Sequence, residues 1–171
     1  MRPQRLNRWS FLLAGVFIVM ALLYALVSVF LANGVTKADR VAFEHTPDEY
    51  NLLFNEVTFN TRGDGISLKG WYIPFAEDAP TIIFVHGLGN NRAGDEALDL
   101  ASRLWAEGFN TLLFDLRGHG TSGDGKVSGG YFEQNDLMGA YDFLINEGVR
   151  PERIGVIGFS MGAAASVLGV S

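Results

Sequence analysis

Residues 11–32 form a run of 22 residues that contains no charged side chain. At about 1.5 Å of rise per residue, a helix of that length spans roughly 33 Å, more than the hydrocarbon core of about 30 Å of a typical bilayer. A helix also hydrogen-bonds the backbone polar groups within the segment, which is necessary because the hydrocarbon core contains no water to bond them. Trp9 precedes the run, where an interfacial aromatic residue belongs. We therefore predict a transmembrane helix over residues 11–32 that attaches the chain to a lipid bilayer.

The charges before this helix predict its orientation. Arg2, Arg5 and Arg8 are the only charged residues before Lys37. Basic residues that flank a span tend to stay in the cytoplasm. We therefore expect residues 1–10 to be a cytoplasmic basic N-terminus, and the rest of this single-pass membrane protein to lie on the extracytoplasmic side.

Two alternatives to a retained anchor stay open. One is a cleaved signal peptide, although the apolar region of such peptides usually has only about 7–15 residues. The other is a buried core helix, although core helices keep a polar stripe, which residues 11–32 lack. The length of the uncharged run favours the anchor.

The rest of the chain is acidic. The protein has a net charge of −6, and residues 33–171 carry 10 basic and 19 acidic side chains. Because a nucleic-acid partner requires a basic face, we expect none. The chain has no cysteine, which excludes disulfides, cysteine zinc sites and thiol nucleophiles. Histidine and acidic residues show no ligand spacing, so we predict no metal site and no cofactor.

Apolar runs and apolar stripes alternate along this acidic part. After a linker with a short helical turn, residues 33–55, we predict a hairpin of two strands, then three strands buried on both faces and two amphipathic helices between them. The strands are expected at 56–60, 66–73, 81–85, 110–114 and 154–159, and the helices around 97–105 and 137–145. This alternation predicts an α/β fold with a mostly parallel sheet and helices on both faces. Glu133 and Asp136 stand at the start of the second helix, where carboxylates stabilise the helix dipole, so we assign them no catalytic role.

The sequence Gly158-Phe159-Ser160-Met161-Gly162 follows the last predicted strand and precedes three alanines. A G-x-S-x-G pattern between a strand and a helix is typical of a nucleophile elbow, in which a strained turn projects the serine hydroxyl. Gly158 and Gly162 are expected because side chains there would collide with the turn. Ser160 is therefore our candidate catalytic nucleophile. The alternative is an ordinary tight turn in which Ser160 caps the helix.

A serine nucleophile needs two N–H donors for the oxyanion that forms on the substrate. The Met161 amide is one candidate, because it opens a helix whose N-terminus adds partial positive charge. The Leu88 amide is the other, in the loop that follows the strand at 81–85. Gly87 and Gly89 let the backbone of that loop approach a substrate closely.

Other polar residues in these loops are predicted to have structural roles. We expect the imidazole of His86 to hydrogen-bond loop backbone. Asp115 and Arg117 are expected to bond loop backbone or each other. His119 stands between two glycines and is expected to be a turn residue rather than a base.

Three of these motifs, residues 86–89, 115–122 and 158–162, together resemble the α/β-hydrolase superfamily in their order and spacing. The resemblance extends from about Glu56 to Gly169. Residues 64–74 look like the opening hairpin of the Bem46-like and serine aminopeptidase-like branch. The resemblance implies a partial α/β-hydrolase domain over 56–171, with Ser160 as nucleophile and the Leu88 and Met161 amides as oxyanion hole.

The resemblance also implies a triad acid and histidine after the serine. No acidic residue and no histidine follows Ser160 in the 171 residues. We therefore expect an N-terminal portion, truncated after the elbow and inactive alone, of a membrane-anchored serine hydrolase. It would cleave the ester, amide or peptide bond of a small-molecule substrate through an acyl-enzyme on Ser160. The alternatives are a non-catalytic membrane-tethered pseudo-hydrolase or binding module, and an enzyme that uses His119 as its base.

Overall fold

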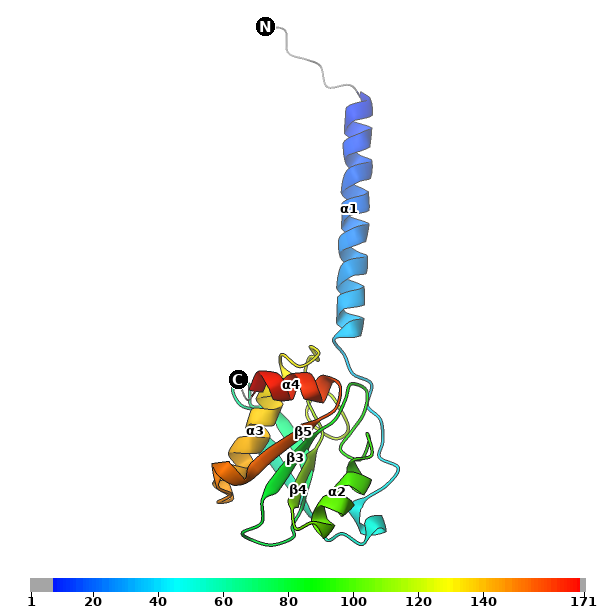
Figure 1. Ribbon diagram of the computed structural model, residues 1–171. Coiled ribbons are helices and arrows are strands. Elements are labelled where there is room, and N and C mark those ends of the chain that lie inside the picture. Colours follow the sequence, from blue (N-terminus) through cyan, green and yellow to red (C-terminus); the bar gives the residue numbers. More distant parts are fainter. Residues whose placement is uncertain (1–7, 170–171) are drawn as a thin grey trace. The chain divides into compact units, whose positions relative to one another are not determined.

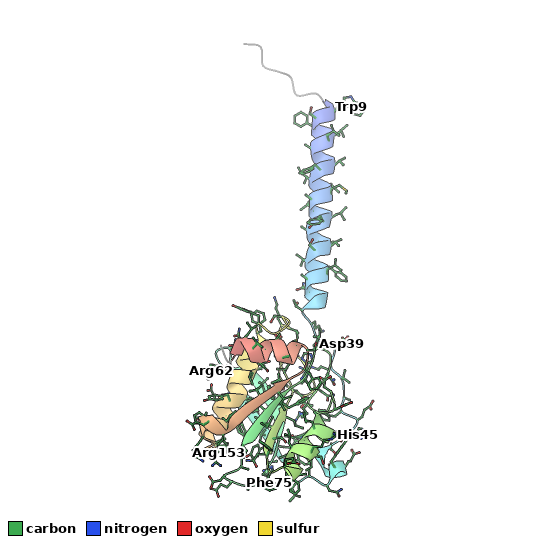
Figure 2. All side chains as sticks on the ribbon, in the orientation of Figure 1. Trp9, Asp39, His45, Arg62, Phe75 and Arg153 are labelled. Carbon is green, nitrogen blue, oxygen red and sulfur yellow. The ribbon has the colours of Figure 1, made fainter. Side chains whose placement is uncertain are left out.

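The computed structural model describes residues 8–169, in two units that comprise Met1–Thr36 and Lys37–Ser171. The described part of the first unit is one helix, α1 (Arg8–Val35), with Trp9 at its start (Figure 2). It is long and apolar enough to cross a membrane, and no residue in its most apolar stretch is buried. The predicted helix is therefore confirmed, and the alternative of a core helix is wrong. Residues 1–7, most of the predicted basic N-terminus, lie outside the described residues, as do residues 170–171.

The second unit is built on a five-stranded sheet (Figure 1). Its strands are β1 (Asn55–Asn60), β2 (Ser67–Ile73), β3 (Thr81–Val85), β4 (Asn110–Phe114) and β5 (Ile154–Gly158). The spatial order is β1-β2-β4-β3-β5, and β3 pairs in parallel with β4 and β5. β2 is antiparallel to both β1 and β4. The predicted hairpin and parallel strands are confirmed, with bounds that differ by one residue at the start of β1, the start of β2 and the end of β5.

Three helices cover this sheet. They are α2 (Ala97–Ala106), α3 (Glu133–Asn146) and α4 (Met161–Gly169). Two short 3₁₀ turns, η1 (Pro47–Tyr50) and η2 (Pro151–Arg153), complete the secondary structure of the unit. The first of them is the predicted short helical turn, and it begins with a capping box in which the Glu49 carboxylate accepts a hydrogen bond from the Thr46 N–H at 3.1 Å.

The core consists of two apolar layers because successive side chains of a strand point to opposite faces. Ile83 and Val85 belong to the layer that includes residues of α3 and α4, whereas Phe84 between them packs with residues of α2. Each of the three is at most 2% exposed, so each contributes roughly 1.5–3 kcal/mol of burial free energy. Buried strands with helices on both faces leave the loops at the strand ends as the place for a site.

The two ends of the parallel strands differ in their chemistry. Figure 2 labels Phe75 and Arg153 near the amino ends, where the Asn110 side chain ties the Phe75 and Ala76 amides to the start of β4. At the carboxyl ends, the loops after β3, β4 and β5 contain the residues that the sequence singled out.

Candidate functional site

Ser160 occupies a sharp turn between β5 and α4. Its φ is 48°, in the left-handed region, and its side chain is exposed. Such a conformation costs a non-glycine residue about 1–2 kcal/mol. The Phe159 N–H donates to the Val85 carbonyl at 2.9 Å, and the Gly162 N–H donates to the Phe159 carbonyl at 2.7 Å. The turn is thereby fixed to the end of β3, with the serine directed outward.

The two glycines of the motif are required by close backbone contacts. A Cβ on Gly158 would lie 2.5 Å from the Gly162 carbonyl oxygen. A Cβ on Gly162 would lie 2.1 Å from the Val85 carbonyl oxygen. Both distances are far inside van der Waals contact with backbone atoms, which cannot move aside cheaply. The predicted collision of side chains at these two positions with the turn is therefore confirmed.

The loop after β3 lies beside Ser160. A Cβ on Gly87 would lie 3.4 Å from the Ser160 Cβ. The Gly87 N–H donates to Asp95 at 2.7 Å. In the part of the chain that the structure describes, neither the Leu88 N–H nor the Met161 N–H donates a hydrogen bond to another residue. The structure therefore places two free amides in the two loops that meet at the serine.

Both buried histidines of the site are held as neutral rings. His86 donates from Nδ1 to the Gly87 carbonyl at 2.7 Å, and its Nε2 accepts the Leu116 N–H at 3.0 Å. His119 donates from Nδ1 to the Arg117 carbonyl at 2.8 Å, and its Nε2 accepts the Gly89 N–H at 3.2 Å. Burial lowers the pKa of His86 to about 4 and lowers that of His119 as well.

These bonds decide the roles of the two rings. An imidazole nitrogen that accepts a backbone N–H has no lone pair left to take a proton. The predicted backbone bonding of His86 is confirmed, and so is the structural role of His119. The alternative in which His119 is the base therefore lacks the free nitrogen that it needs.

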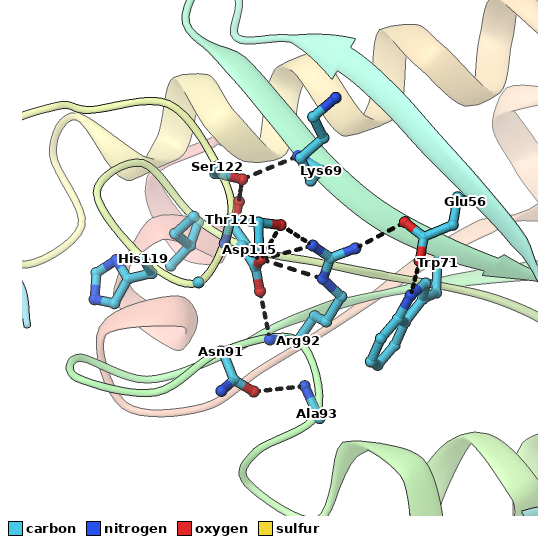
Figure 3. A network of polar contacts seen from close by, with 12 residues as sticks. Glu56, Lys69, Trp71, Asn91, Arg92, Ala93, Asp115, His119, Thr121 and Ser122 are labelled. Carbon is cyan, nitrogen blue, oxygen red and sulfur yellow. Dashed lines mark hydrogen bonds and ion pairs between the residues drawn. The ribbon is translucent and has the colours of Figure 1, made fainter. Parts of the chain in front are cut away.

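Asp115 was predicted to bond either loop backbone or Arg117, and the structure shows the first of these. It is buried and accepts the backbone N–H groups of Arg92 and Thr121, both at 2.8 Å, as the prediction of backbone bonding requires. Its ionic partner is Arg92, whose Nη2 lies 2.9 Å away, so the alternative of a pair with Arg117 is wrong (Figure 3). The Arg92 guanidinium also lies about 5 Å from the ring centres of Phe43 and Trp71.

Arg117 instead pairs with the start of α3. Its Nε donates to Asp136 at 2.8 Å, and its Nη1 donates to Asp64 at 2.8 Å. Glu133, in the same first turn of α3, accepts the Gly130 N–H at 2.7 Å. Asp136 and Glu133 thus begin a helix as predicted, but both are buried and hold loops in place. Among residues 8–169, no group of three His, Asp or Glu side chains is placed to hold a metal ion.

Comparison with known proteins identifies this arrangement. The model of the alpha/beta hydrolase fold matches residues 80–168, from the start of β3 into α4. The chain belongs to the α/β-hydrolase family. Among its relatives, an uncharacterized protein of Salmonella typhi, YfhR, is 32% identical over 85% of this chain, and one of Bacillus subtilis, YqkD, is 33% identical over 61% of it.

A solved structure shows the same α/β-hydrolase fold. The Pyrococcus furiosus esterase Pf2001 superposes with a TM-score of 0.71 and 34% identity over 79% of this chain. The chain spans about half the length of the proteins it matches, 49% of YfhR and 52% of Pf2001. The matched half of the α/β-hydrolase fold holds the loops after β3, β4 and β5.

Proposed function

We propose that this α/β-hydrolase cleaves an ester, amide or peptide bond of a small-molecule substrate through an acyl-enzyme on Ser160. The observation that supports the proposal best is the left-handed, outward-facing Ser160 at the head of α4. Two amides without a partner in the described chain flank it, those of Leu88 and Met161. The esterase Pf2001 among the similar structures favours esters.

The proposed reaction follows from this geometry. The Ser160 Oγ attacks the substrate carbonyl carbon while its proton passes to a base, and the carbonyl π electrons move onto oxygen. The Leu88 and Met161 N–H groups bind that oxyanion, and loss of one such donor typically costs about 10²–10³ in rate. The oxyanion then re-forms the carbonyl and expels the leaving group, which takes the proton from the base. Water repeats the two steps on the acyl-enzyme and frees Ser160.

We place the base of this reaction outside residues 1–171. His86 and His119 each use both ring nitrogens to bind backbone groups. The chain also spans only about half of its relatives' length. Residues 1–171 alone should therefore bind a carbonyl compound without turning it over.

A fluorophosphonate probe tests the role of Ser160 in the protein as its gene encodes it. We expect labelling that disappears in Ser160→Ala and persists in Ser166→Ala. Ser166 is a matched control because its hydroxyl donates to the Gly162 carbonyl at 2.7 Å within α4. A folded protein without labelling would instead indicate a pseudo-hydrolase or binding module. Labelling of residues 1–171 alone would contradict the placement of the base.

We also propose that α1 is a retained membrane anchor, with residues 1–10 in the cytoplasm and the hydrolase domain outside. The apolar length of α1 and the arginines before it support this. The absence of cysteine offers a clean test. In intact cells, an impermeant maleimide should label Glu77→Cys but not Gln4→Cys. The reverse pattern would contradict the orientation, and a mature protein that lacks residues 1–35 would indicate a signal peptide.

A further inference from the structure

Three consecutive amides in the loop after β3 have three different environments. The Gly87 N–H donates to the Asp95 carboxylate at 2.7 Å, and the Gly89 N–H donates to the His119 Nε2 at 3.2 Å. The Leu88 N–H between them donates to no residue in the described chain. The two outer amides are thus held by side chains, Asp95 from the later part of the same loop and His119 from the loop after β4, while the middle one stays available.

We propose that Asp95 is a positioning residue for the reaction on Ser160. By holding the Gly87 N–H, it fixes the peptide plane before residue 87, and the His86 Nδ1 holds the Gly87 carbonyl of the next plane at 2.7 Å. Together these bonds set the direction of the Leu88 N–H. His119 holds the far side of the same segment. The inference rests on the proposed function, in which the Leu88 N–H binds the oxyanion.

The backbone at Asp95 supports this role. Asp95 and Glu96 have φ values of 54° and 58°, so two successive non-glycine residues are left-handed directly before α2. Each costs about 1–2 kcal/mol, although Asp tolerates this region better than most residues. The 2.7 Å bond to Gly87 is a charge-assisted hydrogen bond of the stronger kind, and it offsets part of that cost. This strained conformation places the carboxylate against the loop.

Asp95 makes fewer contacts than the buried carboxylates Asp115 and Asp136. Asp115 and Asp136 each hold an arginine, whereas Asp95 has no ion pair in the part of the chain described. Its one hydrogen bond is to Gly87, the residue whose Cβ position lies 3.4 Å from the Ser160 Cβ. A side chain engaged only with this loop acts on the geometry beside the nucleophile.

The Gly89 end of the 87–89 segment is held by His119. The His119 ring is buried, and the Arg117 carbonyl sets its orientation through Nδ1. Arg40 donates to the Gly120 carbonyl at 2.7 Å and thereby holds the turn that contains the histidine. Loss of Asp95 would therefore free the Gly87 N–H, while the bonds of the Gly87 carbonyl and of the Gly89 N–H stay in place.

Four variants test the inference in the protein as its gene encodes it. Asp95→Gly accepts the left-handed backbone but loses the carboxylate, and Glu96→Gly makes the same backbone change next to it. Asp95→Asn keeps a hydrogen-bond acceptor without charge, and Asp95→Glu keeps the charge but moves the acceptor by one methylene. The readouts are the fluorophosphonate labelling rate and the hydrolysis of p-nitrophenyl butyrate, with thermal unfolding as a check of the fold.

The expected order separates positioning from other roles. Asp95→Gly and Asp95→Glu should lower kcat about 10–100-fold with KM changed less than about threefold, because the amide acts on the transition state. Asp95→Asn and Glu96→Gly should stay within about threefold of the wild type. If Asp95→Gly unfolds, the contrast between Asn and Glu decides alone.

Two results would overturn the inference. Equal activity of Asp95→Gly and Glu96→Gly would show that the Gly87 bond has no bearing on the reaction. Activity retained by Asp95→Glu and lost by Asp95→Asn would assign the effect to charge rather than to position. A wild-type protein that is never labelled would refute the proposed function itself, and the inference with it.

Discussion

Replacement of Arg92 by methionine tests the ionic pairing that the sequence did not predict. The Arg92 side chain is 2% exposed and donates to Asp115 from Nε at 3.1 Å and from Nη2 at 2.9 Å. Methionine retains apolar contact with Phe43 and Trp71 but removes the cation. Asp115, which is fully buried, then keeps its charge without a counter-ion.

The expected cost follows from what Asp115 retains. Removal of one partner of a buried ion pair typically costs about 3–5 kcal/mol. Asp115 would still accept the backbone N–H groups of residue 92 and Thr121, so we expect a loss of about 3 kcal/mol in the free energy of unfolding. The exposed pair between Arg103 and Asp99, at 2.9 Å, is a matched control, and Arg103→Met should cost less than about 1 kcal/mol.

Urea unfolding in detergent, followed by Trp71 fluorescence, measures these costs. Trp71 is 1% exposed and lies against the Arg92 guanidinium, so it reports on this part of the core. Asp115→Asn removes the buried charge, and in the Arg92→Met background it should cost about 2 kcal/mol less than in the wild type. A cost of Arg92→Met equal to that of Arg103→Met would refute the pairing. Stronger coupling of Asp115→Asn to Arg117→Met than to Arg92→Met would refute it as well.

Three further predictions concern the elbow, the pH dependence and the anchor. Gly162→Ala should abolish fluorophosphonate labelling, because its Cβ would lie 2.1 Å from the Val85 carbonyl oxygen. The Cβ of Gly169→Ala would have the end of the Leu137 side chain, 3.3 Å away, as its nearest neighbour, so this variant should be labelled normally. The pKa of His86 is lowered from 6.5 to about 4, so the unfolded chain binds a proton first and the free energy of unfolding should fall by roughly 3 kcal/mol as pH drops from 6.5 to 4. His86→Gln should lack that pH slope in urea titrations, and an unchanged slope would contradict the assignment. Protein that begins at Lys37 should be extracted from membranes by alkaline carbonate, while the chain with α1 should remain in the pellet.

The architecture could be predicted from the sequence because its signals are local. In the run 81–85 every residue after Thr81 is apolar, whichever face of the strand it lies on, which indicates burial on both faces, and the observed β3 has those bounds. The elbow was predictable for the same reason, since Gly158, Ser160 and Gly162 meet within one turn. Burial of apolar side chains stabilises a short apolar run as a strand with little dependence on the rest of the sequence.

The ionic contacts could not be predicted because they join loops that are distant in sequence. Arg92 reaches Asp115 across 23 positions, and Arg117 reaches Asp64 across 53. A charge has no periodicity that indicates its partner, so the prediction chose the arginine nearest in sequence to Asp115. Asp95 was missed because its role depends on a left-handed backbone that sequence patterns favour only for glycine.

The same contacts bear on where the base of the proposed reaction lies. A group that fixes a loop must keep its hydrogen bonds, whereas a general base must release and regain a proton in each cycle. His86, His119, Asp95 and Asp115 all bind backbone N–H groups near the carboxyl ends of the strands. Protonation of either histidine at Nε2 would break a bond that holds the loops around Ser160. The features that preorganise the proposed oxyanion site therefore remove these two histidines from acid–base chemistry, and the base of the proposed reaction has to come from a residue without such a bond.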